Sequence, residues 1–77
     1  MLMLELPTEN VELKERFQRL NLPRRMIVMT YFEIKKNDQG SLHRFIPKIA
    51  AQLRYSIDVN GSNSYLQRVI QEFLGVR

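Results

Sequence analysis

The last 32 residues of the chain contain two amphipathic helical patterns on either side of a polar turn, and they constrain the fold more than any other segment. Within each pattern, the apolar residues recur at the spacing that places them on one face of a helix with 3.6 residues per turn. The first stripe consists of Ile46, Ile49, Ala50, Leu53 and Ile57, and the second of Leu66, Val69, Ile70, Phe73 and Leu74. Each predicted helix therefore needs a partner surface against which this face is buried.

Two further helices are predicted upstream of this pair. Thr8 is expected to cap the first helix, which ends near Leu20 because Asn21 suits a left-handed position and Pro23 prevents continuation. Pro23 fits the first turn of a second helix running to about Asn37. Its apolar centre, residues 26–34, is rich in β-branched and aromatic residues, so a buried strand is the alternative. Because apolar and polar residues do not alternate strictly there, we expect a helix through the core.

Proline 47 limits how the first C-terminal helix can begin. An interior proline destabilises a helix by about 3 kcal/mol, so one helix running unbroken from Ser41 is not expected. The sequence predicts a short extended or single-turn segment from Leu42 to Phe45, then a helix with Pro47 in its first turn that ends near Ser56. Asn60 and Gly61 predict a turn, Ser62 or Asn63 an N-cap, and Gly75 the end of the last helix.

These patterns predict an all-α fold: a compact four-helix domain with a helix-turn-helix-like C-terminal pair. Residues 1–7 are expected to form an apolar N-terminal arm, and residues 8–77 a single helical domain. If the arm and residues 42–45 paired as strands, the fold would instead approach a winged helix with minor β structure.

A chain of 77 residues buries a small core, and such cores usually need additional stabilisation. The chain has no cysteine and one histidine, which argues against disulfides and a metal site and leaves a second subunit. The arm is apolar and has no local helix to cover. We therefore expect a homodimer whose interface includes residues of this arm, namely Met1, Leu2, Met3, Leu4 and Leu6.

Composition and charge narrow the classes of function. His43 is the only histidine, no cysteine is present, and the three glycines, at positions 40, 61 and 75, form no glycine-rich phosphate loop. We therefore expect no enzyme and no cofactor. The sequence shows neither a transmembrane segment nor a signal peptide, which predicts a cytoplasmic protein without membrane contact. Residues 1–22 have three basic and four acidic side chains, whereas residues 23–77 have nine basic and four acidic. This asymmetry favours a polyanionic partner.

The outward face of the last helix is polar, with a single carboxylate at Glu72. In a helix-turn-helix, such a face meets base edges in the major groove, and cations nearby hold phosphates. The sequence thus predicts a small sequence-specific DNA-binding regulator. Its candidate contacts are Arg24, Arg25, Arg44, Lys48, Arg54, Asn63, Ser64, Gln67, Arg68 and Gln71. The alternative is an adaptor or inhibitor that docks on an acidic protein surface through its helix faces and never touches nucleic acid.

Overall fold

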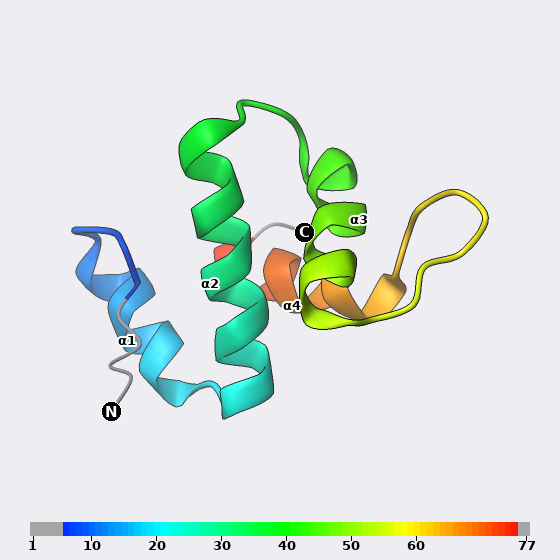
Figure 1. Cartoon of the computed structure of the whole chain (residues 1–77). Coiled ribbons are helices and arrows are strands. Elements are labelled where there is room, and N and C mark those ends of the chain that lie inside the picture. The colour runs from blue at the N-terminus through cyan, green and yellow to red at the C-terminus, as the bar shows by residue number, and fades with distance from the viewer. Residues whose placement is uncertain (1–5, 76–77) are drawn as a thin grey trace.

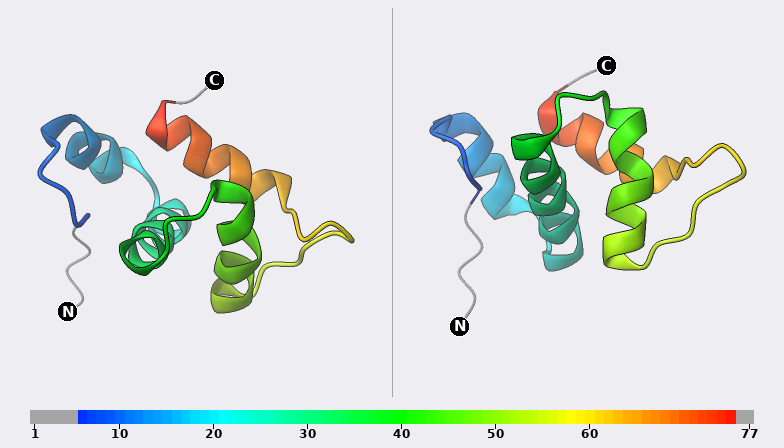
Figure 2. Two further views of the ribbon diagram at one scale, coloured as in Figure 1. Left: turned by 90° about the horizontal axis from the view of Figure 1, so that it is seen from above. Right: turned by 45° about the horizontal axis from the view of Figure 1, so that its top comes forward.

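The computed structural model describes residues 6–75, and in them all regular structure is helical. The elements are α1 (Val11–Arg19), α2 (Leu22–Asn37), α3 (Leu42–Leu53) and α4 (Ser64–Leu74). Helices α2 and α3 form an antiparallel hairpin, α4 passes behind both, and α1 lies beside α2 (Figure 1). Seen from above, α1 lies near the C-terminal end of α4 (Figure 2). The predicted all-α fold of four helices is confirmed, with no strand among the described residues.

Helix α2 packs against both α3 and α4, and α4 in turn contacts all three other helices. Ile27 and Val28 are fully buried and Tyr31 is nearly so. The buried apolar surface of α2 therefore extends over more than one face of the helix. The buried hydroxyl of Thr30 donates to the Met26 carbonyl at 2.8 Å, so it leaves no unsatisfied donor. Residues 26–34 lie within α2, so they are helical, as the absence of alternation predicted, and the strand alternative is excluded.

One apolar cluster joins all four helices. Edge-to-face aromatic pairs connect the elements, with ring centroids 5.7 Å apart for Tyr31 and Phe45 and 6.2 Å apart for Phe32 and Phe73. The buried apolar residues of the cluster are Leu6, Phe17, Ile27, Val28, Tyr31, Phe45, Ile46, Ile49, Ala50, Leu66, Val69, Ile70 and Phe73. Most members of the two predicted C-terminal stripes are among them, whereas Ile57 lies beyond the end of α3 and is exposed.

Asparagine side chains begin three of the four helices, and this corrects two expectations. The cap of α1 is Asn10, whose Oδ1 accepts from the Leu13 amide at 3.2 Å, rather than Thr8. Asparagine is the stronger N-cap, and Thr8 instead accepts from the Asn10 amide. Asn21 has extended backbone and accepts from the Arg24 amide at 3.1 Å. It therefore caps α2 and does not close α1, because α2 starts at the very next residue.

Helix α3 runs unbroken from Leu42 with Pro47 inside it, so the predicted extended segment at residues 42–45 is wrong. Proline removes the amide that would bond to the His43 carbonyl, but His43 is exposed. The continuous helix buries Phe45 and Ile46 together with Ile49, on both sides of the proline, and this burial outweighs one lost hydrogen bond. Because residues 42–45 are helical, the winged-helix alternative loses the strand it required.

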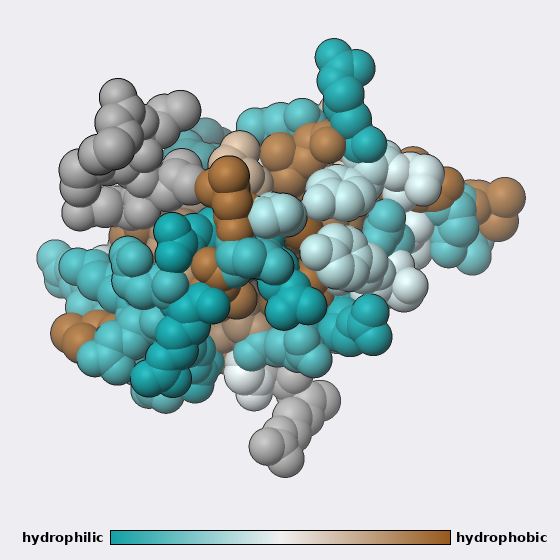
Figure 3. Space-filling view, turned by 90° about the horizontal axis from the view of Figure 1, so that it is seen from below, coloured by the Kyte–Doolittle hydropathy of each residue, from teal (hydrophilic) through white to brown (hydrophobic). Residues whose placement is uncertain are grey.

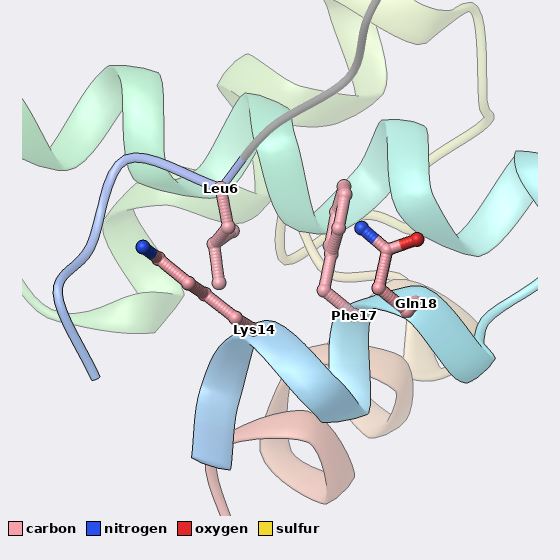
Figure 4. A pocket seen from close by; sticks show the side chains of 4 residues that line it. All are labelled: Leu6, Lys14, Phe17 and Gln18. Atoms are coloured by element: carbon pink, nitrogen blue, oxygen red, sulfur yellow. The ribbon is translucent and has the colours of Figure 1, made fainter. Parts of the chain in front are cut away.

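The first described residue, Leu6, is only 5% exposed and belongs to the core of its own domain. Its side chain descends between Lys14 and Phe17 of α1 and, with Gln18, these residues line a small cavity of about 110 Å³ (Figure 4). Leu6 is therefore not available for the predicted dimer interface, because α1 supplies the cover that the sequence did not reveal. The other predicted interface residues, Met1 to Leu4, lie outside the described part of the chain.

Candidate nucleic-acid interface

The outer face of α4 is polar, as the sequence predicted. Leu66, Val69, Ile70 and Phe73 face the core, and on the opposite side Ser64 and Arg68 are exposed. Gln67 and Gln71 are half-buried beside them. Among residues 6–75, no salt bridge involves a residue of α4. The hydroxyl, amide and guanidinium groups on this face are therefore free of charged partners and can donate to or accept from a ligand.

The ends of α4 are fixed by its own sequence. Gly75 ends the helix in the left-handed conformation, with φ of 76°, as predicted. Asn63 starts the helix by accepting from the Leu66 amide at 3.0 Å, and its amide group donates to the Ser56 carbonyl at 2.7 Å. Because both functional ends of the Asn63 side chain are occupied, this predicted base-contacting residue positions α4 instead.

The connection from α3 to α4 has ten residues, Arg54 to Asn63, against three or four in a compact helix-turn-helix. Asp58 organises its tip by accepting from the amides of Asn60 at 2.8 Å and Ser62 at 2.9 Å. The connection projects away from the helices (Figure 2), and hydrophobic and hydrophilic residues lie side by side at the end of the projection (Figure 3). Val59 is fully exposed there. The C-terminal pair thus has a longer turn than a compact helix-turn-helix, as its sequence indicated.

Two of the predicted phosphate contacts on α3 are paired within the protein. The Asp38 carboxylate accepts from Lys48 Nζ at 3.0 Å and lies 3.1 Å from Arg44 Nε, in the turn between α2 and α3. The Lys48 hydrogen bond, the Gly40 amide and the nearby Arg44 hold the pKa of Asp38 below its usual value, against a smaller opposing effect of desolvation. Nothing in the sequence near Lys48 indicated this pairing, which brings together residues ten positions apart.

Of the arginines at the start of α2, Arg25 serves the contact between α1 and α2. Its Nη2 donates to the Gln18 carbonyl at 2.7 Å, and its guanidinium lies 5.9 Å from the centre of the Phe17 ring. The cation–π contact and the hydrogen bond explain a cation at the positive end of a helix without any external anion. Arg25 is therefore a structural residue in this domain.

Arg24, in contrast, lies beside two arginines of α1 that the sequence did not single out. Arg16, Arg19 and Arg24 line one groove between α1, α2 and α4. The N-terminal segment is acidic on balance, which obscured its contribution to a basic surface. The spacing of Arg16 and Arg19, three residues apart and thus on one helix face, was the available signal.

The remaining predicted phosphate contact, Arg54, is exposed at the C-terminal end of α3. It adopts the left-handed conformation with φ of 64°. The next residue, Tyr55, packs on Tyr65 of α4 with ring centroids 6.0 Å apart. Arg54 is therefore placed next to the N-terminal half of α4, whereas Arg44 and Lys48 are bound to the turn at the opposite end of α3.

Within residues 6–75, histidine and acidic side chains do not gather into any group of three that could hold a metal ion. No helix in this part of the chain has the length and apolarity to cross a bilayer. A search of protein-family models, curated sequences and solved structures finds no match to this chain.

Proposed function

We propose that this chain is a small sequence-specific DNA-binding regulator in which α4 is the recognition helix. The supporting observation is the outer face of α4, where Ser64, Gln67, Arg68 and Gln71 lie together and, within residues 6–75, form no salt bridge. Arginine pairs with guanine and glutamine with adenine through two hydrogen bonds each, so the face has the chemistry of base recognition. The net charge of +4 supports attraction to a polyanion.

We propose that fewer residues touch DNA than the sequence suggested. Arg68, Gln67, Gln71 and Ser64 would meet base edges, and Arg54 would meet a phosphate next to the start of α4. Arg44 and Lys48 each form a salt bridge with Asp38, and this carboxylate would compete with a DNA phosphate for them. One short helix reads few base pairs, and we propose that a homodimer presents two copies to symmetric half-sites.

The test is selection of a binding site from a random duplex library, followed by titration of selected and scrambled duplexes. Arg68→Ala should reduce the preference for the selected duplex by about 1 to 3 kcal/mol, the value of one bidentate base contact. The matched control is Lys36→Ala on α2, which removes one exposed cation far along the chain from α4 and should weaken both duplexes alike.

The binding curves at two salt concentrations separate base contacts from general attraction. Arg54→Ala should reduce the slope of log affinity against log salt by about one unit without changing the preference for the selected duplex. If Arg68→Ala and Lys36→Ala behave identically, α4 does not recognise bases and the proposal is wrong. Light scattering of the complex tests the homodimer separately.

The second candidate is a protein-binding adaptor or inhibitor without nucleic-acid contact. The observation that favours it is apolar exposure on the connection between α3 and α4, where Ile57 is 47% exposed and Val59 fully exposed. The two residues are two positions apart in one connection, and contiguous exposed apolar surface marks sites of protein interaction. An absence of salt-dependent binding to any duplex would favour this candidate.

A further inference from the structure

A groove between α1, α2 and α4 has an apolar floor that its own domain leaves partly uncovered. The floor consists of Leu20 from the end of α1 and of Val69 and Phe73 from α4. Val69 and Phe73 are 5% and 4% exposed, so they are core residues whose outer edges reach the surface. The groove has a volume of about 230 Å³.

Cations surround this floor. The groove is lined by Arg16, Arg19 and Arg24, with Glu72 as its one carboxylate. Within residues 6–75, neither Arg19 nor Arg24 takes part in a salt bridge. Arg24 also belongs to the first turn of α2, where the helix dipole adds positive potential. The rim is therefore net positive over an apolar surface.

One of these cations is fixed in place. Arg16 Nη1 donates to the Phe73 carbonyl at 2.9 Å, and its Nη2 lies 2.8 Å from Glu12. The first bond joins α1 to the C-terminal turn of α4 and satisfies a carbonyl that the helix end leaves without an intrahelical partner. The groove is consequently held open between two helices, with a preorganised rim, and a ligand does not have to order Arg16.

We propose that this groove binds an acidic peptide segment of a partner protein, with one large apolar side chain on the floor and flanking carboxylates against Arg19 and Arg24. The volume is below the range of about 300–1,000 Å³ that is usual for small-molecule sites. It suits a single side chain, and hydrophobic anchors with charged neighbours are the pattern of peptide recognition. A nucleic-acid backbone offers the negative charge but no apolar group for the floor.

The experiment uses the full chain labelled with ¹⁵N and the capped peptide Asp-Glu-Glu-Phe-Leu-Glu-Asp as the probe, in buffer of low ionic strength. Titration should shift the amide resonances of Leu20, Val69 and Phe73. A second peptide has serine in place of the Phe-Leu pair, and a third has amides in place of the acids. Loss of the apolar anchor should weaken binding about ten-fold or more.

Substitutions of the arginines that line the groove test whether they contact the acidic side chains of the peptide. The double variant Arg19→Gln and Arg24→Gln should bind the first peptide about three- to thirty-fold more weakly than the parent, and the difference should shrink as salt is added. The control Lys36→Gln removes an exposed cation that does not line the groove, and it should leave peptide affinity unchanged. Circular dichroism confirms that each variant is folded, which is expected because both groove substitutions are at exposed positions.

Several results would overturn the proposal. One is the absence of shifts at the groove residues with millimolar peptide, and another is equal binding by the serine peptide or by the double variant. Equal shifts with phenylacetate at the same concentration would assign the groove to small aromatic acids. Loss of a dimer in the double variant would assign it to a second copy of the chain. Duplex DNA that shifts these residues while the peptide does not would assign it to phosphates. The peptide result is independent of DNA recognition by α4.

Discussion

Replacing Pro47 by alanine should stabilise the domain, because α3 continues through this proline without a break. Alanine restores an amide that can donate to the His43 carbonyl four residues earlier, and it removes the clash between the proline ring and that carbonyl. The three prolines of the chain have different environments, since Pro7 precedes α1, Pro23 lies in the first turn of α2 and only Pro47 is inside a helix.

The magnitude follows from three contributions. Alanine in a helix interior is favoured over proline by about 3 kcal/mol. Against this, the unfolded chain gains freedom when proline is removed, which destabilises by about 0.4 to 1 kcal/mol. The ring also lies against the connection to α4, with its Cγ 3.4 Å from where a side chain at Gly61 would begin. Alanine lacks both Cγ and Cδ, and losing these two partly buried methylenes costs about 0.8 kcal/mol together. The net stabilisation is about 1 to 2 kcal/mol, or roughly 5 to 15 °C in Tm.

Thermal and urea unfolding followed by circular dichroism measure this change, and Pro23→Ala is the matched control. Pro23 occupies a position that has no intrahelical bond to restore, so its replacement should lower stability by about 0.4 to 1 kcal/mol through the unfolded chain alone. Amide exchange at residue 47 of the Pro47→Ala variant should show protection. A variant that unfolds at lower urea concentration than the parent, or one whose new amide exchanges freely, would refute the reasoning.

Three further substitutions test other parts of the fold. Phe17→Ala removes the only fully buried side chain of α1 and should destabilise the domain by about 3 to 5 kcal/mol, close to the whole stability of a small domain. Phe17→Leu should destabilise it by less than about 1.5 kcal/mol, and urea unfolding measures both variants. Arg54→Gly should raise stability by about 0.5 to 1 kcal/mol by relieving a left-handed residue, with Arg54→Lys giving no gain. The folded pKa of Asp38 is depressed, so its contribution is present above the unfolded pKa near 3.8 and is lost as pH falls through the folded value. Asp38→Asn should therefore be less stable than the parent at neutral pH, and a gap that persists undiminished at pH 2 would contradict this account.

Helix existence and burial could be predicted from the sequence because they depend on local periodicity. The stripes of α3 and α4 and the apolar centre of α2 all form helices with those faces buried. The predictions of helix boundaries were wrong where contacts between residues far apart in the sequence determined where a helix begins or ends. Pro47 is accommodated because Phe45 and Ile49 on either side of it are both needed in the core. Ile57 has helical spacing but falls beyond the left-handed residue Arg54, which ends α3 early.

The candidate site was predictable only in part. The outer face of α4 follows from one helical period and is where the sequence placed it. The fate of the cations depends instead on which residues the fold brings together, and no spacing encodes it. Asp38 binds Arg44 and Lys48, and Arg25 packs on Phe17, so formal charge overstated what these positions can offer a ligand. Conversely, the basic groove includes two arginines from residues 1–22, a segment in which acidic side chains outnumber basic ones.

The attachment of α1 to the rest of the domain has a consequence for the lifetime of the two surfaces. This helix has nine residues and one fully buried side chain, while α2, α3 and α4 pack on one another. It is thus the element most readily released by sub-global opening, and its amide hydrogens should exchange before those of the other helices. Release of α1 would dismantle the arginine groove and leave the face of α4 intact. One surface therefore persists through a fluctuation that transiently removes the other.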